Sequence, residues 1–242
     1  MKRALIPVVV AVIVGFSLVW VANIISGTVV SIKNKGYVTV KGFAKKAIKS
    51  DLGIFSATIV REDENLQVCY KNVTADKKKV KNFLKRFGIR KENIEFYPTQ
   101  IGERYKINER GYATDEFINY KLSQTFKVES NNVASIAELS ERISELLDDG
   151  VKMFVSSPEY VYTKLDDLKV EMIGKATANA KMRADIIAKR GRFRLGSISS
   201  VRVGIFQITP LHSTDVSDYG INDTTSIEKE IKSVVEVRYF VK

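Results

Sequence analysis

Side chains that commonly perform catalysis are scarce in this sequence of 242 residues. It contains a single histidine, His212, so one chain has no histidine pair for a metal, and the zinc motif His-Glu-x-x-His is absent. The nucleophile elbow Gly-x-Ser-x-Gly, the phosphate-binding Walker loop and the dinucleotide fingerprint are absent too. His212 lies in a long polar loop, where a solvated imidazole is expected. We predict no catalytic residue, no cofactor and a protein that is not an enzyme.

Two adjacent carboxylate pairs stand where helix ends are expected. Asp148-Asp149 closes one predicted helix, and Asp166-Asp167 opens another. Aspartate at a helix N-terminus caps free N–H groups and interacts favourably with the helix dipole. We therefore interpret both pairs as surface or capping groups and not as a general acid and base.

The loop at residues 211–226 is the one place that faintly resembles a calcium site. It contains Asp215, Asp218 and Asp223 around Gly220. If Asp215 were the first ligand, position 12 would be Ser226, where an EF-hand loop has glutamate. A divalent-metal site in this loop is the weaker alternative, and we predict no metal site.

The single cysteine, Cys69, excludes a disulfide within the chain. We expect it to be a small buried side chain on a helix, since free cysteine is usually buried. The whole sequence has 28 acidic and 39 basic residues, which give it a net charge of +11.

Basic residues are densest around residues 77–91. Lys77, Lys81 and Lys85 are spaced i, i+4 and share one face of a predicted helix, whose apolar residues take the other side. A solvated basic face is the first interpretation, and attraction to an anionic membrane surface or envelope polymer is the alternative. Nucleic acid is not an expected partner, because no aromatic-basic motif accompanies the charge.

The N-terminus predicts a membrane segment. Lys2-Arg3 precedes an uncharged stretch, residues 4–25, which as a helix would rise about 33 Å, the thickness of a bilayer core. No Ala-x-Ala-like cleavage site follows, so we expect a retained signal anchor at residues 1–25, with a cleaved signal peptide as the alternative. The positive-inside rule then places residues 26–242 outside the cytoplasm, in the periplasm or on the outer surface, with the anchor in the inner (cytoplasmic) membrane.

Beyond the anchor, strands and helices alternate irregularly. Strands are predicted at residues 37–44, 52–60, 94–101, 118–129, 151–155 with 160–162, 198–208 and 231–241. Helices are predicted at residues 73–87, ended by Gly88, at 133–147, and at 166–190. Residues 108–111 are predicted to form a turn, and residues 198–208 and 231–241 to pair as a hairpin around the long loop.

Periodicity then indicates which faces are buried. In residues 118–129, Ile118, Tyr120, Leu122, Phe126 and Val128 point one way, as in an antiparallel sheet covered on one side. In residues 166–190 the inner stripe is predicted to be Leu168, Met172, Ala176, Ala180, Ala184 and Ile187. So many alanines suggest a close approach of this helix to the sheet.

Hairpins interrupted by helices indicate an α+β fold, with antiparallel sheets and helices packed on one face. No linker rich in Pro, Gly or Ser divides the chain, so residues 26–242 are expected to form one domain, with two lobes as the alternative.

Several stretches together resemble the SIMPL-domain family of envelope proteins, which includes the periplasmic immunogenic proteins. The main one is ATANAKMRADIIAKRG at 176–191, followed by RLGSI at 194–198; YVTVKG at 37–42, FLKRFGI at 83–89, GYA at 111–113 and the strand at 231–241 complete the set in order. The resemblance implies an α+β fold, an envelope location and, for some members, ring-like homo-oligomers. It implies no catalytic residue.

The leading hypothesis is therefore a membrane-anchored envelope protein that forms a homo-oligomer or acts through protein interaction, with no small-molecule substrate. The alternative is a module that binds an anionic small molecule or cell-wall polymer through its basic surface. Tyr112, beside the turn at Gly111, and Tyr219, in the long loop, are the expected contact residues.

Overall fold

The computed structural model describes residues 15–17, 19–24 and 36–242. Residues 15–17 and 19–24 are helical, and the rest of the predicted membrane segment at 4–25 lies outside the described residues. Within the described part of the chain, no helix combines the length and the apolar character needed to cross a bilayer. The chain divides into two compact units: unit 1 runs to Ala44 and adds Met172–Gly204 and Ser233–Lys242, and unit 2 comprises Lys45–Glu171 and Ile205–Lys232.

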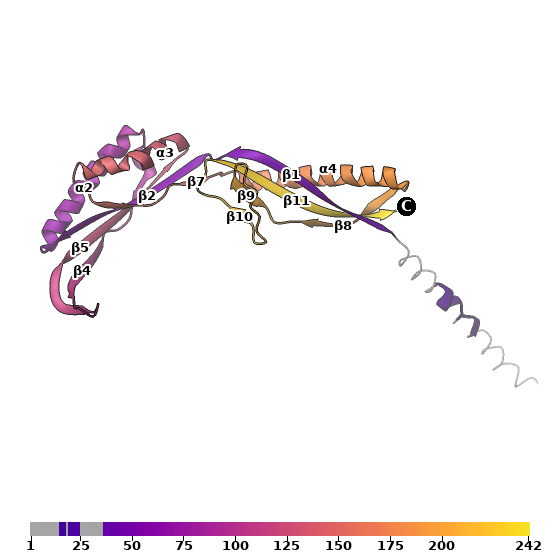
Figure 1. Cartoon of the computed structure of the whole chain (residues 1–242), viewed down its shortest axis with the longest axis horizontal. Coiled ribbons are helices and arrows are strands. Elements are labelled where there is room, and N and C mark those ends of the chain that lie inside the picture. Colours follow the sequence, from indigo (N-terminus) through magenta and orange to yellow (C-terminus); the bar gives the residue numbers. More distant parts are fainter. Residues whose placement is uncertain (1–14, 18, 25–35) are drawn as a thin grey trace, which may run out of the picture. The chain divides into compact units, whose positions relative to one another are not determined.

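The described elements follow one another in a mixed order of strands and helices (Figure 1). In chain order they are β1 (Tyr37–Lys49), β2 (Leu52–Asp63), α2 (Leu66–Arg86), the 3-10 turn η1 (Lys91–Asn93), β3 (Ile94–Phe96), β4 (Gln100–Ile107), β5 (Ala113–Ser130), α3 (Val133–Arg142), the 3-10 turn η2 (Ile143–Leu147), β6 (Met153–Val155), β7 (Glu159–Val161), α4 (Leu165–Gly191), β8 (Leu195–Val203), β9 (Gln207–Pro210), β10 (Ile221–Asn222) and β11 (Glu228–Val241).

Unit 2 is built on a six-stranded antiparallel sheet. Its centre is the long pairing of β2 with β5, from Gly53 opposite Ser130 to Asp63 opposite Tyr120. Strands β3 and β4 pair with the other side of β5, while β6 and β7 pair with the other side of β2. Strands β3 and β4 therefore form one edge of the sheet, and β6 and β7 form the other.

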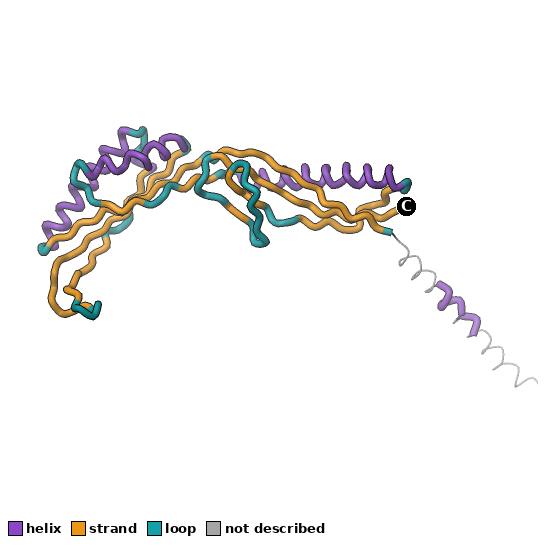
Figure 2. The backbone as a smooth tube through the Cα atoms, in the orientation of Figure 1, coloured by secondary structure: helices purple, strands orange, loops and turns teal. Residues whose placement is uncertain are grey.

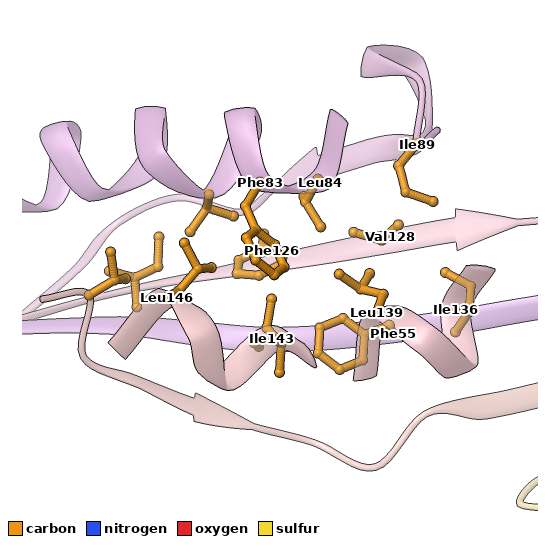
Figure 3. Close-up of a cluster of buried hydrophobic side chains, with 14 of the residues drawn as sticks. Phe55, Phe83, Leu84, Ile89, Phe126, Val128, Ile136, Leu139, Ile143 and Leu146 are labelled. Atoms are coloured by element: carbon orange, nitrogen blue, oxygen red, sulfur yellow. The ribbon is translucent and has the colours of Figure 1, made fainter. Parts of the chain in front are cut away.

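Helices cover one face of this sheet, where the main core lies. Figure 1 shows α2 and α3 on the same side of β2 and β5, and Figure 3 shows Phe55 and Phe126 of the strands among side chains from both helices. The fully buried members include Ile59, Leu84, Ile136, Leu139 and Leu146. On the opposite face, Thr58 and Thr125 share a hydroxyl hydrogen bond of 2.9 Å across the strands. The predicted α+β class, with antiparallel sheet and helices on one face, is confirmed.

The predicted alternation in β5 is confirmed over its second half only. Leu122, Phe126 and Val128 are fully buried, but Ile118 is 44% exposed, which contradicts its predicted place in the core. The helical cover explains the difference, because α2 begins beside Tyr120, where the Cys69 thiol contacts the Tyr120 carbonyl oxygen at 4.0 Å. The buried position between Leu122 and Phe126 holds Gln124.

Helix α2 is seven residues longer at its start than the predicted helix at 73–87. Asn65 caps it, since its side-chain oxygen accepts hydrogen bonds from the N–H groups of Gln67 (2.9 Å) and Val68 (3.1 Å). The first two turns expose most of their side chains, so they lack the apolar periodicity on which the prediction rested. The predicted end is confirmed: Gly88 follows the helix with φ of +72°, a conformation that glycine adopts without strain.

The predicted strand at 94–101 is in fact two strands. Strand β3 ends at Phe96, and β4 begins at Gln100, on either side of Pro98. Proline has no N–H to donate to a ladder. Gln124 supports the break, because its side-chain amide donates to the carbonyl oxygen of Tyr97 at 3.0 Å.

In unit 1, most of α4 lies beside parts of β1, β8 and β11. β11 pairs antiparallel with β8, from Val235 opposite Val203 to Val241 opposite Leu195, and β1 pairs with the other side of β11. Figure 2 shows the helical part of α4 running alongside these strands. The close approach predicted from the alanines is confirmed: a Cβ added to Gly42 would lie 2.0 Å from the carbonyl oxygen of Ala176 and 2.5 Å from the nitrogen of Ala180.

One residue of the buried stripe predicted for α4 is wrong. Ile187 is 45% exposed, and Ala188, one residue later, is buried in its place. From Met172 onward the buried positions recur every fourth residue, so the stripe after Ala184 continues at Ala188. Asp166 and Asp167 lie in the first turn of α4, and Lys189 and Arg190 in its last, as predicted.

The hairpin predicted around the long loop is confirmed with a break in its first strand. β8 and β9 both pair antiparallel with β11, and residues 204–206 separate them. The loop at 211–226 is mostly without regular structure, but it contains the short strand β10, which pairs parallel with β9.

Candidate interaction surfaces

The residues considered for chemistry do not converge. His212 is an exposed loop residue with φ of +66°. Asp215 accepts a hydrogen bond from the neighbouring Ser213 hydroxyl, whereas Asp223 is buried. In the described ranges, no three His, Cys, Asp or Glu side chains form a group that could hold a metal ion.

Asp223 instead stabilises the end of the loop. Its Oδ1 accepts hydrogen bonds from the N–H (2.8 Å) and hydroxyl (2.8 Å) of Thr225 and from the N–H of Ser226 (3.2 Å). Burial acts to raise the pKa of the Asp223 carboxyl, but these hydrogen bonds and the charge of Lys229 outweigh it, so the pKa is lowered. Asp223 is thus expected to be ionised in the folded protein.

Lys229 is a buried cation beside this aspartate. It is 2% exposed, and its ammonium donates to the carbonyl oxygens of Tyr160 (2.5 Å) and Asp223. Burial lowers the pKa of Lys229, against the opposing effect of the Asp223 charge. Both residues line a cavity of about 70 Å³. Because the ammonium joins β7 to the loop through two backbone carbonyls, we interpret this cluster as structural.

A second buried charge pair lies under α2. Asp76 is 1% exposed and accepts two hydrogen bonds from the Arg61 guanidinium, one of them 2.9 Å long. The hydrogen bond that Arg61 donates to Asp76 raises the pKa of Arg61 and exceeds the opposing effect of burial. The pair fixes the helix to β2, because Asp76 belongs to α2 and Arg61 to β2.

The β4–β5 hairpin of unit 2 exposes several large apolar side chains. We call residues 100–118, its part beyond the helices, the arm. Figure 1 shows it curving away from α2 and α3. Every residue of β4 is exposed, including Ile101 (60%) and Ile107 (65%). At the tip, Asn108 closes the predicted turn by accepting hydrogen bonds from the N–H groups of Arg110 and Tyr112 (both 3.0 Å).

Aromatic rings form a cluster that extends from the middle of the arm to Tyr120, just beyond it. Tyr105 and Phe117 lie edge to face with centroids 6.2 Å apart, and Phe117 lies 5.0 Å from Tyr120. Tyr105 and Phe117 are opposite each other in register, next to a register shift in the ladder. Both rings remain about 40% exposed, so the cluster presents apolar surface to the solvent.

The charges of the arm are largely neutralised. Arg104 pairs with Glu62 at 2.9 Å, and Lys106 with Glu116 at 3.1 Å. Residues 100–118 contain four carboxylates and three basic groups, a net charge of −1 within a chain of +11. A second copy can therefore approach the arm without strong repulsion.

The opposite edge of the same sheet is also apolar. In β6, Phe154 is 67% exposed and Val155 is 47% exposed. An edge strand has N–H and C=O groups on one side that are not paired within the sheet, and another strand can pair with them. Unit 2 thus exposes apolar side chains at both edges of its sheet.

The α2 helix presents the main basic surface. The Lys77 and Lys81 ammonium groups lie 4.5 and 5.2 Å from the centre of the Phe96 ring. Beyond them lies a groove of about 530 Å³ whose lining includes Lys81, Lys85, Arg90 and Lys91. The predicted amphipathic helix is confirmed, since Val73, Val80, Phe83 and Leu84 on its other side are buried.

Antiparallel sheets with helices packed on one face define the class as α+β. Within this class, residues 38–239 match the model of SIMPL, described as "Protein of unknown function (DUF541)". The chain belongs to the SIMPL family, which confirms the resemblance seen in the sequence. A comparison with curated proteins found no match.

Sequence reasoning singled out Tyr112 and Tyr219, which the structure leaves 70% and 97% exposed. It missed the cluster of Tyr105, Phe117 and Tyr120 because the adjacent Phe117 and Ile118 of β5 are both exposed, and a strand with exposed apolar residues on both faces gives no clear period. It also missed the contribution of Arg90 and Lys91 to the groove, because these residues come after the end of α2 and helical periodicity does not place them. The available signal for the arm lay in β4, where the apolar residues Ile101, Tyr105 and Ile107 all fall at odd positions.

Proposed function

We propose that this chain is a membrane-anchored envelope protein that is not an enzyme and works by assembling with copies of itself through the arm. The observation that carries the proposal is the arm: exposed Ile101, Ile107, Tyr105 and Phe117 on a nearly neutral hairpin. Apolar side chains grouped on a hairpin with solvent on both faces commonly mark a surface that a partner covers.

The partner we propose is a second copy of the same chain. The arm lies at one edge of the sheet and β6, with Phe154, at the other. If the arm of one copy contacts the β6 edge of the next, the interface is heterologous, and a heterologous interface that closes forms a ring. Such an interface would bury on the order of 800 Å² per partner.

The anchor and the location are proposed from the N-terminal sequence. Lys2-Arg3 and the uncharged residues 4–25 support a helix retained in the cytoplasmic membrane with the rest of the chain outside the cytoplasm. Intact-mass analysis of the membrane-extracted protein should place its first residue at 1 or 2. A mature chain that begins near residue 26 would replace the anchor with a cleaved signal peptide.

Assembly is tested by light scattering on residues 26–242 at about 0.15 M and about 0.5 M salt. We expect a multiple of the monomer mass under both conditions, because the arm contacts are apolar. Tyr105→Thr with Phe117→Thr should shift the mass toward the monomer. Met182→Gln with Ile186→Gln, an apolar pair on α4 that is somewhat more exposed than the arm pair, is the control and should leave the mass unchanged.

A monomer at micromolar concentration in both salts would refute assembly by the exported part. An oligomer that survives the arm substitutions would keep assembly but exclude the arm as its contact surface. If the arm substitutions do disrupt the oligomer, Phe154→Thr tests the heterologous arrangement, because it should disrupt the oligomer in the same way.

A further inference from the structure

The exposed surface of α2 carries positive charge almost without compensation. Its single acidic residue, Asp76, is buried against Arg61. In the second half of α2, lysines occupy most of the positions outside the core, whereas Glu and Lys paired at i, i+4 would stabilise a solvated helix. Here Lys77, Lys81 and Lys85 follow one another at that spacing, and like charges so placed destabilise a helix.

Burial and this crowding both lower the pKa of Lys77, and burial has the larger effect. The crowding acts through the charge of Lys81. Both ammonium groups lie over the Phe96 ring, which partly compensates. The like charges therefore form a positive surface that could accept a ligand of opposite charge.

The groove beyond the end of α2 adds cations from a second segment. Lys81 and Lys85 line it from the helix, and Arg90 and Lys91 line it from the residues that follow Gly88. Arg90 pairs with Glu92 at 3.3 Å. Among the residues that the structure describes, no carboxylate lies within ion-pair distance of Lys81, Lys85 or Lys91.

The spacing along the helix suggests the shape of the ligand. Each step from Lys77 to Lys81 to Lys85 advances about 6 Å along the axis, at about 1.5 Å per residue. Three charges in a row that lead into an open groove fit a linear chain with repeated anionic groups better than one compact anion. Lysine ammonium groups bind phosphate as point charges.

We propose that Lys77, Lys81 and Lys85, together with the groove at Arg90 and Lys91, bind a linear polymer that carries phosphate groups. This inference does not rest on assembly, because the arm and the groove lie on different elements of unit 2. A flat anionic membrane is a poorer fit, since a membrane-bound helix inserts its apolar side, whereas that of α2 is buried in the core.

The test uses the full-length chain in a non-ionic detergent with fluorescently labelled linear inorganic polyphosphate. The groove variant is Lys81→Gln, Lys85→Gln and Lys91→Gln. The control variant is Lys41→Gln, Lys181→Gln and Lys189→Gln, which removes the same charge from exposed positions in unit 1. Circular dichroism and light scattering on the same samples verify folding and record the oligomeric state.

We expect the groove variant to bind polyphosphate at least about tenfold more weakly than the wild type, and the control variant within about twofold. The slope of log K against log salt should fall by about two, since each lost phosphate contact contributes about 0.7. An equal loss in both variants would overturn the proposal, because the polymer would then sense only net charge.

Two further measurements distinguish other ligands. Monomeric phosphate that displaces the polymer at equal phosphate concentration would replace the linear ligand with a single-anion site. Binding of residues 26–242, without detergent, to phosphatidylglycerol vesicles but neither to phosphatidylcholine vesicles nor to polyphosphate would overturn the proposal in favour of an anionic membrane surface. Because light scattering reports assembly separately, loss of binding with the oligomer intact is attributable to the groove alone.

Discussion

Replacing Gly42 with alanine tests how closely α4 lies on β1. Gly42 is buried where the helix crosses the strand, and the added Cβ would stand 2.0 Å from the Ala176 carbonyl oxygen and 2.7 Å from the Ala180 Cβ. Non-bonded carbon contacts lie at about 3.5–4.0 Å. The backbones must therefore move apart by more than about 1 Å, because neither the carbonyl nor the alanine has a rotatable side chain to yield.

This displacement would also lengthen two polar contacts between the same elements. Asn179 accepts a hydrogen bond from the Phe43 N–H at 3.1 Å, and Arg183 donates to the Lys41 carbonyl at 3.0 Å. Overpacking costs about 1–3 kcal/mol, and each weakened hydrogen bond adds about 1 kcal/mol. We expect Gly42→Ala to lower the free energy of unfolding by about 3 kcal/mol or more.

The assay is thermal unfolding of the variant beside Gly174→Ala. Gly174 lies on the exposed side of α4, with nothing near its added Cβ. A loss of about 3 kcal/mol lowers Tm by about 6–12 °C in a chain of this size. Gly174→Ala should instead raise stability by about 0.5–1 kcal/mol through helix propensity. A Gly42→Ala variant within about 0.5 kcal/mol of the wild type would refute the close packing.

Three further predictions concern unit 2. Leu122→Asp should unfold it by placing an unpaired charge in the core, while Ser123→Asp, on the other face, should be tolerated; equal melting temperatures would mean that the buried face is wrong. The pKa of Asp223 is lowered in the folded protein, so Asp223→Asn should be less stable than the wild type at pH 7. This difference in stability should disappear as the pH falls through the folded pKa of Asp223, and a difference that stays constant from pH 7 to about 2 contradicts the prediction. Asn65→Ala should cost about 1 kcal/mol in denaturant melts by removing the cap of α2, and no change would show that the cap is not important.

The fold could be predicted from the sequence where one face is buried and the other is wet. Leu122, Phe126 and Val128 alternate with polar residues because α2 and α3 cover only one side of β5. The same rule failed at Ile118, since periodicity records side-chain type and not the length of the covering helix. At Gln124 a polar residue is buried because it satisfies the Tyr97 carbonyl, a long-range contact with no local signal.

The interaction surfaces were less accessible to sequence reasoning. The lysine face of α2 could be predicted, because it depends only on helical periodicity. The groove depends on where the chain goes after Gly88, and the Tyr105–Phe117 contact depends on a register shift between β4 and β5. Both are tertiary features. The division of the chain into two units could not be predicted either, because no linker of distinctive composition separates them.

The single cysteine makes the base of the arm observable. Cys69 is fully buried with Val73 and Leu122, and its thiol contacts the Tyr120 carbonyl at 4.0 Å. Burial raises the thiol pKa, which further slows its reaction with alkylating reagents. Modification therefore requires α2 and β5 to separate, and the labelling rate of the native chain measures the opening frequency of this junction. A partner that covers the arm would slow that rate, so one thiol provides a kinetic readout of assembly without any added probe.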